Sequence, residues 1–375
     1  MMKLFPAQEV GSLSRAPFLK KRTEKTIEET RRWGERLGVE GLERLLEILR
    51  NPTEAQKNLK TLYDYASLFA VRFFESAGLD VVWDGEQKRV EMYEHPLRFV
   101  KNFRFLGVVK VWDGEFYRKG AFTGPPQLTE PYHLDEYLYV KRIAKRRIKV
   151  PMTGAYTLAD WSFDEYYLSK YLMLEDPLEA RRRAKEEMVI DIARNIIRPN
   201  ILALVEAGAK RIQIDEPAVT SKPEEVPLMV EALNESVRGV NAIITLHVCY
   251  SDYSRLFPYI AEARIHQISI ECSNRDTREP GVSPEKRPGF KVVELFREYT
   301  PWMEVAPGVI DVHTDFIEPP ELVRDRLLYA SKAMGDESRI IACNDCGLRT
   351  RSWEVAYEKE RNMVRGAELA RMAYA

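Results

Sequence analysis

The sequence has few cysteines and no long hydrophobic run, and each shortage excludes a class of protein. Four cysteines among 375 residues are too few for the disulfide framework of a small secreted domain. No apolar stretch approaches the ~20 residues that a membrane-spanning helix needs, and residues 1–21 lack the apolar core of a signal peptide. We therefore expect a cytoplasmic protein with no membrane partner.

An excess of charge of one sign is also lacking. The 57 basic and 58 acidic residues give a formal net charge of −1, so the sequence has no basic excess of the kind that nucleic-acid binding requires. Hydrophobic residues, by contrast, make up 45% of a chain that is long enough to bury a large core. One α/β barrel of roughly 250 residues with extensions, or two domains, would account for this length.

Short apolar segments alternate with helical patterns along most of the chain. Apart from one hairpin, the pattern of a strand occurs near residues 10, 81, 150, 213, 245, 269, 304 and 341. Each segment is followed by helical sequence, and such alternation is typical of a parallel sheet. Eight strand–helix units in this length predict an α/β fold of the (β/α)8 TIM barrel type, formed as a single domain over residues 1–375.

Two segments extend the predicted barrel. Residues 23–78 have a helical pattern with Arg- and Glu-rich faces, which predicts an N-terminal helical extension. Residues 103–125 contain aromatic and branched side chains around Asp113-Gly114, which is typical of a β-hairpin insertion. A later helix is expected to begin at Asp176, with Pro177 at its first position, and to be broken or kinked at Pro199.

Thiol, imidazole and carboxylate side chains lie at the ends of predicted strands. His247 and Cys249 are two residues apart, so both side chains point the same way on an extended backbone. Glu271 ends the next apolar run, and Cys346 follows the last one. Catalytic groups of such barrels lie where the strands end. Because Zn²⁺ binds nitrogen, sulfur and oxygen ligands in sets of four, these side chains predict a zinc site that activates a thiol.

Each of these features also has a simpler interpretation. A single H-x-C pair on a strand is more often part of a core than of a metal site, and Cys343 could pair with Cys346 or help to hold a structural zinc. By the same argument, His313 could be a surface or capping histidine and Trp161 a core residue. The joint placement of these side chains at successive strand ends favours a functional site over the separate alternatives.

At this point the sequence resembles a known family, the cobalamin-independent methionine synthases, and specifically their catalytic C-terminal barrel. The resemblance covers nearly the whole chain. It depends on the motifs Gly11-Ser12, Asp84-Gly85-Glu86, Thr153-Gly154, Trp161-Ser162-Phe163 and Ile270-Glu271, and on residues 212–218, 247–251, 307–313 and 345–351. By this resemblance the zinc ligands are His247, Cys249, Glu271 and Cys346.

The resemblance also implies a reaction, which is transfer of a methyl group to the thiol of L-homocysteine to form L-methionine. The acids of the implied site hold the homocysteine ammonium and a Gly-Ser turn holds its carboxylate, and the residues concerned are Val10, Gly11, Ser12, Glu86 and Asp215. His313, with Asp311 as its expected partner, matches the proton donor of the family, and Trp161 matches a tryptophan that contacts the pterin of the methyl donor.

Several alternatives remain open at this level. The donor is either methyltetrahydrofolate or a methyl-corrinoid, such as methylcobalamin or a corrinoid protein, because Ser221 stands where the family has a folate-binding glutamate. The thiol acceptor could be another compound such as coenzyme M, although that thiol has no ammonium for Glu86 and Asp215 to bind. A zinc hydrolase would favour His and carboxylate ligands over two thiolates, and a structural zinc would bind no thiol substrate.

Overall fold

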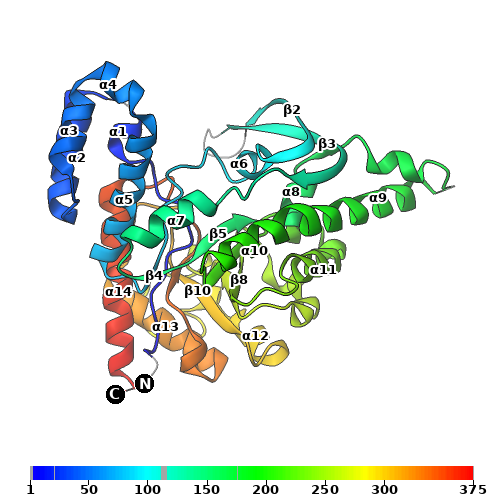
Figure 1. Cartoon of the computed structure of the whole chain (residues 1–375). Helices are drawn as coiled ribbons and strands as arrows, with labels where there is room; N and C mark the ends of the chain where they lie inside the picture. Colours follow the sequence, from blue (N-terminus) through cyan, green and yellow to red (C-terminus); the bar gives the residue numbers. More distant parts are fainter. Residues whose placement is uncertain (1–2, 21, 111–115, 175, 375) are drawn as a thin grey trace.

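The computed structural model of the chain describes residues 3–20, 22–110, 116–174 and 176–374. At its centre is a parallel sheet of six strands with the order β11-β10-β9-β8-β7-β5 (Figure 1). These strands are β5 (Val150–Thr153), β7 (Arg211–Asp215), β8 (Ile243–Val248), β9 (Gln267–Ile270), β10 (Glu304–Ile310) and β11 (Cys343–Asn344). Every residue of β5 and β9 is buried, as expected for parallel strands that are covered on both faces.

The sheet curls because both of its edges continue into further parallel pairings. At one edge, β4 (Arg147–Ile148) leads into β5 and pairs with β1 (Val81–Val82). At the other edge, isolated parallel bridges join Ala7 to Ala342 and Gln8 to β1. The N-terminal segment therefore lies between the last strand and the first.

The expected strand positions agree with these elements, with one difference. The segments near residues 81, 150, 213, 245, 269 and 304 contain strands, and the segment near residue 341 leads into β11. The segment near residue 10, in contrast, makes only isolated bridges at Ala7, Gln8 and Leu13. Pro6 has no N–H to donate to a ladder and Gly11 weakens an extended segment, so a regular strand does not form there.

Helices pack around the sheet and connect its strands (Figure 1). Those that come after β1 are α6 (Glu94–Leu97), α7 (Leu134–Ile143), α8 (Ala155–Asp160), α9 (Pro177–Ile192), α10 (Arg198–Glu206), α11 (Val226–Ser236), α12 (Val293–Tyr299), α13 (Pro320–Met334) and α14 (Trp353–Met372). Parallel neighbours require such crossover connections, and the helices supply the apolar surfaces that bury the strands.

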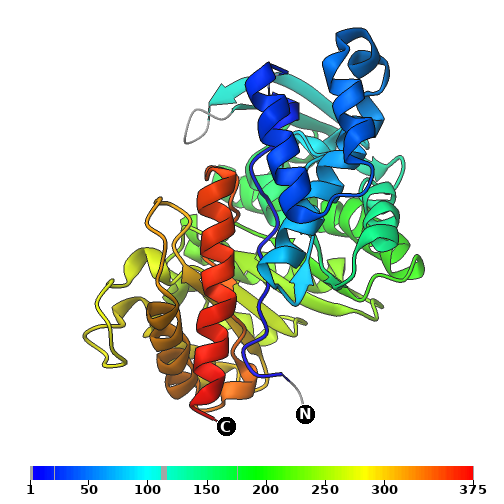
Figure 2. The same ribbon diagram turned by 90° about the vertical axis from the view of Figure 1, so that its left-hand side faces the viewer.

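Residues 24–77 are helical, as their pattern predicted, and several of these helices stand to one side of the sheet (Figures 1 and 2). The helices before β1 are α1 (Pro17–Lys20), α2 (Glu24–Leu37), α3 (Leu42–Arg50), α4 (Pro52–Lys57) and α5 (Leu59–Ala77). Trp33 of α2 packs on Phe73 of α5 and on Trp353 of α14, with ring centroids 5.9 and 5.5 Å apart. These aromatic contacts fasten the N-terminal helices to the helix that follows the last strand.

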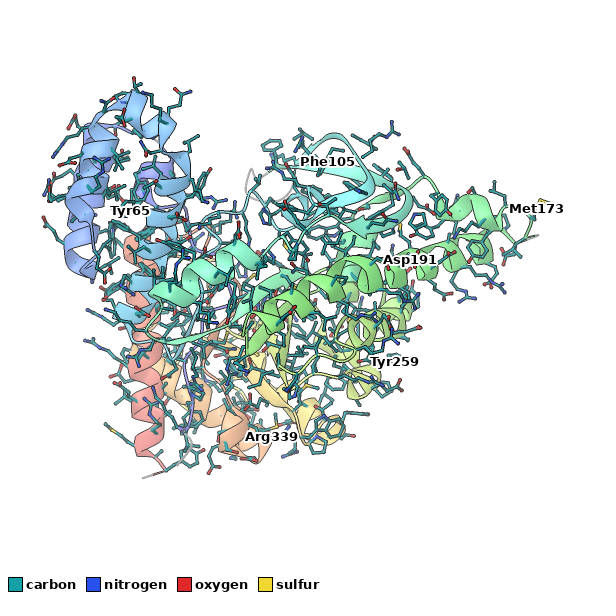
Figure 3. All side chains as sticks on the ribbon, viewed as in Figure 1. Tyr65, Phe105, Met173, Asp191, Tyr259 and Arg339 are labelled. Atoms are coloured by element: carbon teal, nitrogen blue, oxygen red, sulfur yellow. The ribbon has the colours of Figure 1, made fainter. Side chains whose placement is uncertain are left out.

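An antiparallel hairpin lies beyond the C-terminal ends of the parallel strands. It consists of β2 (Val100–Lys110) and β3 (Phe116–Leu128), and β6 (Phe163–Asp164) adds to β3 in parallel. The Asp113-Gly114 turn that predicted the hairpin lies outside the described residues. Figure 3 places Phe105 of the hairpin and Arg339, which precedes β11, at opposite ends of the molecule.

The expected helix at Asp176 is confirmed in detail. The Asp176 carboxylate accepts the N–H of Leu178 at 2.9 Å, and Pro177 occupies the first turn of α9. The interruption predicted at Pro199 is a π-helical turn over Ala193–Ile197 between α9 and α10. Pro199 falls in the first turn of α10, directly after the π-helical turn, and this local widening of the helix accommodates a residue that has no N–H to donate.

The two ends of the described chain lie close together (Figures 1 and 2). Arg371 Nη1 donates to the carbonyl oxygen of Leu4 at 3.1 Å, and the rings of Phe5 and Tyr374 are 5.7 Å apart. None of the described helices combines the length and the apolar character that crossing a lipid bilayer demands.

Gly366 allows α14 to pack closely on α13, and replacing it is expected to destabilise the protein. A Cβ at this position would overlap the side chain of Val323 and lie 2.8 Å from the carbonyl oxygen of Pro320. We expect Gly366→Ala to lower the free energy of unfolding by about 1–3 kcal/mol, despite the better helix propensity of alanine. Urea unfolding measures this, with Arg365→Ala at an exposed neighbouring position as the control. Equal stability of the two variants would contradict the prediction.

Candidate active site

Neighbouring strands carry the polar side chains of the candidate site to one edge of the sheet. His247 lies in β8, in register with Asp215 of β7. Cys249 and Glu271 directly follow β8 and β9, and Cys346 lies shortly after β11. Because the carboxyl ends of parallel strands meet at the same edge, residues far apart in sequence come together there.

One imidazole and two thiols form a cluster at this edge. The ligand atoms of His247, Cys249 and Cys346 all lie within 4.8 Å of one another. His247 Nε2 is buried without a hydrogen-bond partner among the described residues, whereas its Nδ1 lies 3.1 Å from Ser269 Oγ. A ring nitrogen left unpaired beside two thiols, on a ring held from its other side, is typical of a metal ligand.

The cluster favours one thiolate. Hydrogen bonding with Cys249, opposed by burial and assisted by the nearby His247, lowers the pKa of Cys346 well below its usual range. Hydrogen bonding with Cys346, together with burial, raises the pKa of Cys249. The thiolate is the form of cysteine that binds metals and acts as a nucleophile. The environment of Cys346 therefore favours the form of the thiol that binds metals.

Glu271 lies at the edge of this cluster and is held by other groups. Its Oε2 accepts the backbone N–H of Tyr250 at 2.9 Å and the side-chain amide of Asn274 at 2.8 Å. Its Oε1 lies 3.2 Å from His313 Nε2. The cluster of ligand atoms within 4.8 Å of one another contains His247, Cys249 and Cys346 but not Glu271. Glu271 contacts the residue next to Cys249 through its hydrogen bond with the Tyr250 N–H.

The ring of His313 lies between Glu271 and Tyr250, with Nδ1 3.1 Å from the Tyr250 hydroxyl. Hydrogen bonding with Glu271, opposed by burial, raises the pKa of His313. The expectation that Asp311 holds this ring is wrong, because Asp311 Oδ1 accepts the backbone N–H of His313 at 2.9 Å. A short aspartate side chain two residues before an amide reaches that amide in an Asx turn and is then unable to reach the ring.

The expected homocysteine-binding residues lie on adjoining segments. A Cβ on Gly11 would be 2.9 Å from Glu86 Oε1, so this turn and the carboxylate are neighbours. Gln213 Nε2 donates to the carbonyl oxygen of Val10 at 2.8 Å and to Asp215 Oδ1 at 2.7 Å. Burial raises the pKa of Asp215 to about 7.

One small cavity joins these residues to the thiol cluster. Its volume is about 150 Å³, and its lining includes Ser12, Glu86, Cys249, His313 and Cys346. The lining therefore contains at least one residue of each expected kind: substrate-binding, metal-binding and proton-donating. A small molecule in this cavity would contact a carboxylate at one side and the two thiols at another.

A larger cavity of about 930 Å³ adjoins the first, and Tyr250, His313 and Arg349 line both. Trp161 lines the larger one. Its ring stacks on Tyr117 of the hairpin, with centroids 6.0 Å apart and planes inclined by 21°. The hairpin therefore supports a wall of the larger cavity next to His313.

Sequence reasoning gave no role to two residues that shape this site. Glu216 is buried and accepts the backbone N–H groups of Tyr156 and Thr157 at 3.1 and 2.7 Å, which fixes the start of the helix that ends at Trp161. Tyr250, with a φ of 53°, is in a conformation that non-glycine residues rarely adopt. The only sequence signal for Tyr250 was its position directly after Cys249. That position indicates that Tyr250 lies near the site but gives it no role.

The other two cysteines lie outside the cluster. Cys343 is buried, with its sulfur 3.7 Å from Ser269 Oγ. Cys272 is also buried, and all four cysteines are free thiols. The alternative in which Cys343 pairs with Cys346 is therefore wrong, because the two side chains point into different surroundings.

A second group of metal-ligand residue types occurs outside the cluster, namely His95, His133 and Glu136, whose ligand atoms also lie within 4.8 Å of one another. There the Glu136 carboxylate accepts Arg89 Nε at 2.9 Å. Because this carboxylate already has a cationic partner, we interpret the group as a buried ion pair flanked by two imidazoles rather than as a metal site.

An α/β fold with a His–Cys–Cys cluster at the ends of its parallel strands defines an enzyme with a candidate metal centre. Residues 41–369 match the model of a family described as cobalamin-independent synthase, catalytic domain. The chain thus belongs to the cobalamin-independent methionine synthase family. It is a methyltransferase of methionine biosynthesis.

Curated relatives and a solved structure agree with this assignment. The chain is 40% identical over 310 residues to a methionine synthase from Thermoplasma acidophilum, covering 81% of this chain and 88% of that one. It is 36% identical over 307 residues to a methionine synthase from Thermococcus kodakarensis, covering 82% of each. A B12-independent methionine synthase from Shewanella sp. W3-18-1, in complex with selenomethionine, superposes with a TM-score of 0.75 at 24% identity over 99% of both chains. That last similarity is one of fold.

Proposed function

We propose that this enzyme transfers a methyl group to the thiol of L-homocysteine and forms L-methionine. The observation that carries the proposal is the small cavity, which joins the thiol cluster to Ser12 and Glu86. A thiol amino acid in this cavity would place its sulfur beside Cys249 and Cys346 and its ammonium beside a carboxylate. The names of the curated relatives support the same substrate and product.

We further propose that His247, Cys249, Glu271 and Cys346 hold one Zn²⁺. The unpaired Nε2 of His247 beside two thiols fits the ligand preferences of this ion, and Ser269 would fix the ring from its other nitrogen. When bound, Zn²⁺ keeps a coordinated thiol deprotonated, whereas a free thiol with a pKa of about 8.5 is mostly protonated at neutral pH.

The chain's own residues would orient the substrate. Glu86 and Asp215 offer carboxylates to the ammonium, and the Gly11-Ser12 turn offers hydrogen-bond donors to the carboxylate. With its ammonium and carboxylate both held, the substrate would direct its sulfur towards the larger cavity, which His313 lines together with the small one. Holding the sulfur and the donor methyl group in line would make the transfer effectively unimolecular, which removes the entropy cost of bringing two molecules together in solution.

The larger cavity would hold the methyl donor. Trp161, stacked on Tyr117, offers an aromatic surface to a flat ring system such as a pterin. With methyltetrahydrofolate, the S–CH₃ bond forms as the CH₃–N5 bond breaks, and the electron pair left on N5 takes a proton from His313. A methyl-corrinoid donor, either methylcobalamin or a corrinoid protein, would need no such proton because cob(I)alamin leaves with the electron pair unaided.

We also propose that the curled sheet is a closed (β/α)8 TIM barrel within a single domain over residues 1–375. The bridges of Ala7 and Gln8, which connect Ala342 with β1, support closure. The helices between residues 24 and 77 and the hairpin over residues 100–128 would then be insertions into this barrel. Four free thiols fit a reducing compartment, so we propose that the enzyme is cytoplasmic.

Metal and substrate binding together test the proposed function. We expect the purified protein to bind one Zn²⁺ per chain, to release protons when L-homocysteine is added, and then to form L-methionine from at least one donor. Metal analysis, an indicator titration and mass spectrometry measure the three steps. The donors to compare are methyltetrahydrofolate, its polyglutamate form and methylcobalamin. Zinc-loaded protein that produces no methionine with any of them would contradict the proposal.

A further inference from the structure

Arg89 lies buried between two carboxylates, only one of which faces the small cavity. Its Nε donates to Glu136 Oε2 at 2.9 Å, and its Nη1 donates to the carbonyl oxygen of Pro151 at 2.8 Å. Nη1 also lies 3.4 Å from Glu86 Oε1, which is a longer and weaker contact. Glu86 lines the cavity, whereas Glu136 is in the first turn of α7 behind it.

The surroundings of Glu136 make it the principal partner of Arg89. The Glu136 side chain is 5% exposed, and the imidazoles of His133 and His95 lie 3.2 and 3.6 Å from its carboxylate oxygens. Burial, with the charge of Arg89, lowers the pKa of His133 to about 3, so this ring is neutral at pH 7. Burial opposes ionisation of Glu136, but the guanidinium of Arg89 outweighs it and lowers the pKa of Glu136. Arg89 and Glu136 therefore form a buried ion pair.

We propose that Glu136 is a positioning residue that sets the specificity of the enzyme for a thiol bearing an ammonium group. By pairing with Arg89, Glu136 offsets the charge of the guanidinium and leaves the charge of Glu86 available to the substrate. Arg89 offsets the charge of one of these two carboxylates, so a negative charge remains at Glu86 for an ammonium group; the buried carboxyl of Asp84 interacts with the same guanidinium and adds negative charge behind it. This inference rests on the proposed function, because it assigns the ammonium of homocysteine to Glu86.

The consequence of removing Glu136 follows from the cost of a buried unpaired charge. In Glu136→Gln the amide oxygen can still accept Arg89 Nε, but the guanidinium loses its charged partner. Glu86, 3.4 Å from Arg89 Nη1, is then the nearest charged partner left in this pair of carboxylates, and because a poorly paired buried cation is unfavourable, we expect the contact between Arg89 and Glu86 to tighten. Glu86 then interacts less with the ammonium, although Glu136 itself does not line the cavity.

Two thiols that differ only in the amino group separate this effect from a general loss of structure. L-homocysteine and 4-mercaptobutyrate share the chain, the thiol and the carboxylate. Calorimetry on the zinc-loaded protein is expected to show that Glu136→Gln weakens L-homocysteine binding about tenfold, equivalent to about 1.4 kcal/mol, and leaves 4-mercaptobutyrate binding unchanged. Asp135→Asn is the matched control, since it removes an exposed carboxylate from the same helical turn.

A double variant provides the second measurement. Arg89→Met combined with Glu136→Gln removes both buried charges, and we expect it to recover part of the preference for L-homocysteine because Glu86, no longer paired with Arg89, can again interact with the ammonium. Equal weakening of both thiols in Glu136→Gln, or an unchanged preference for L-homocysteine, would overturn the inference. If the wild-type protein itself binds both thiols equally, the ammonium site of the proposed function fails instead.

Discussion

Replacing Cys346 with serine is expected to release the zinc and to lower the rate of methyl transfer by more than about 100-fold. Loss of a group that only orients a metal ligand costs up to about 100-fold, and loss of a ligand itself should cost more. Contact with Cys249 and the nearby His247 lowers the pKa of the Cys346 thiol, so this sulfur is available as a thiolate. A serine hydroxyl at the same place stays protonated at neutral pH and is a poorer ligand beside a thiolate and an imidazole. Metal analysis after dialysis and methionine formation under the same conditions measure the two losses.

Cys343→Ser is the matched control for this experiment. Cys343 is also buried, but its sulfur lies outside the thiol cluster, with weak contacts to Ser269 Oγ at 3.7 Å and to Gln8 Nε2 at 3.9 Å. We expect this variant to keep one zinc ion per chain and most of the turnover. A Cys346→Ser protein that retains stoichiometric zinc would contradict the proposed ligand set, whatever its activity.

Replacing His313 with asparagine is expected to affect the two classes of methyl donor differently. With methyltetrahydrofolate the turnover should fall by roughly 10²–10⁴-fold, the usual contribution of a general acid. The physical reason is that N5 is a poor leaving group unless it takes up a proton, and an asparagine amide is far too weak an acid to supply one. With methylcobalamin the loss should be less than about tenfold, because the corrinoid leaving group needs no proton and a general acid would contribute little.

Single-turnover rates with saturating L-homocysteine and each donor measure this difference. The asparagine amide would lie near the place of Nδ1, beside the Tyr250 hydroxyl, and Glu271 would keep its hydrogen bonds from Tyr250 N–H and Asn274, so the proposed metal ligands should stay in place. Retention of one zinc ion per chain by the variant checks this point. Equal losses with both donors would remove the proton-donating role and leave His313 as a wall of the two cavities.

Local patterns predicted most of the central fold. Buried apolar segments that end before polar residues marked β5, β7, β8, β9 and β10, because parallel strands covered on both faces are apolar along their whole length. The N-terminal segment was harder to predict. It makes isolated bridges to Ala342 and β1, and such contacts depend on the positions of distant partners rather than on its own sequence.

In the candidate site too, local features could be predicted from the sequence and contacts with distant residues could not. The spacing of His247 and Cys249 was sufficient to place two candidate ligands side by side, because the period of a strand is two residues. In contrast, Asp311 was assigned to the ring of His313 by sequence proximity, and the turn directs it to the backbone instead. The Arg89–Glu136 pair was not predicted, because a charged residue on a helix gives no local sign of a buried partner on a distant loop.

The pairing of the N-terminal segment with Ala342 has a consequence for how the protein is synthesised. Ala7 forms a parallel bridge with Ala342, and Cys346 lies next to Cys249 only when β11 has joined the sheet. Contacts so distant along the chain form late and slowly. The proposed metal centre would therefore assemble after β11 has left the ribosome, and a nascent chain halted before that strand would carry His247 and Cys249 without Cys346. On this proposal the metal binds to the finished polypeptide, so the supply of reduced thiols and free metal would matter at release from the ribosome rather than during elongation.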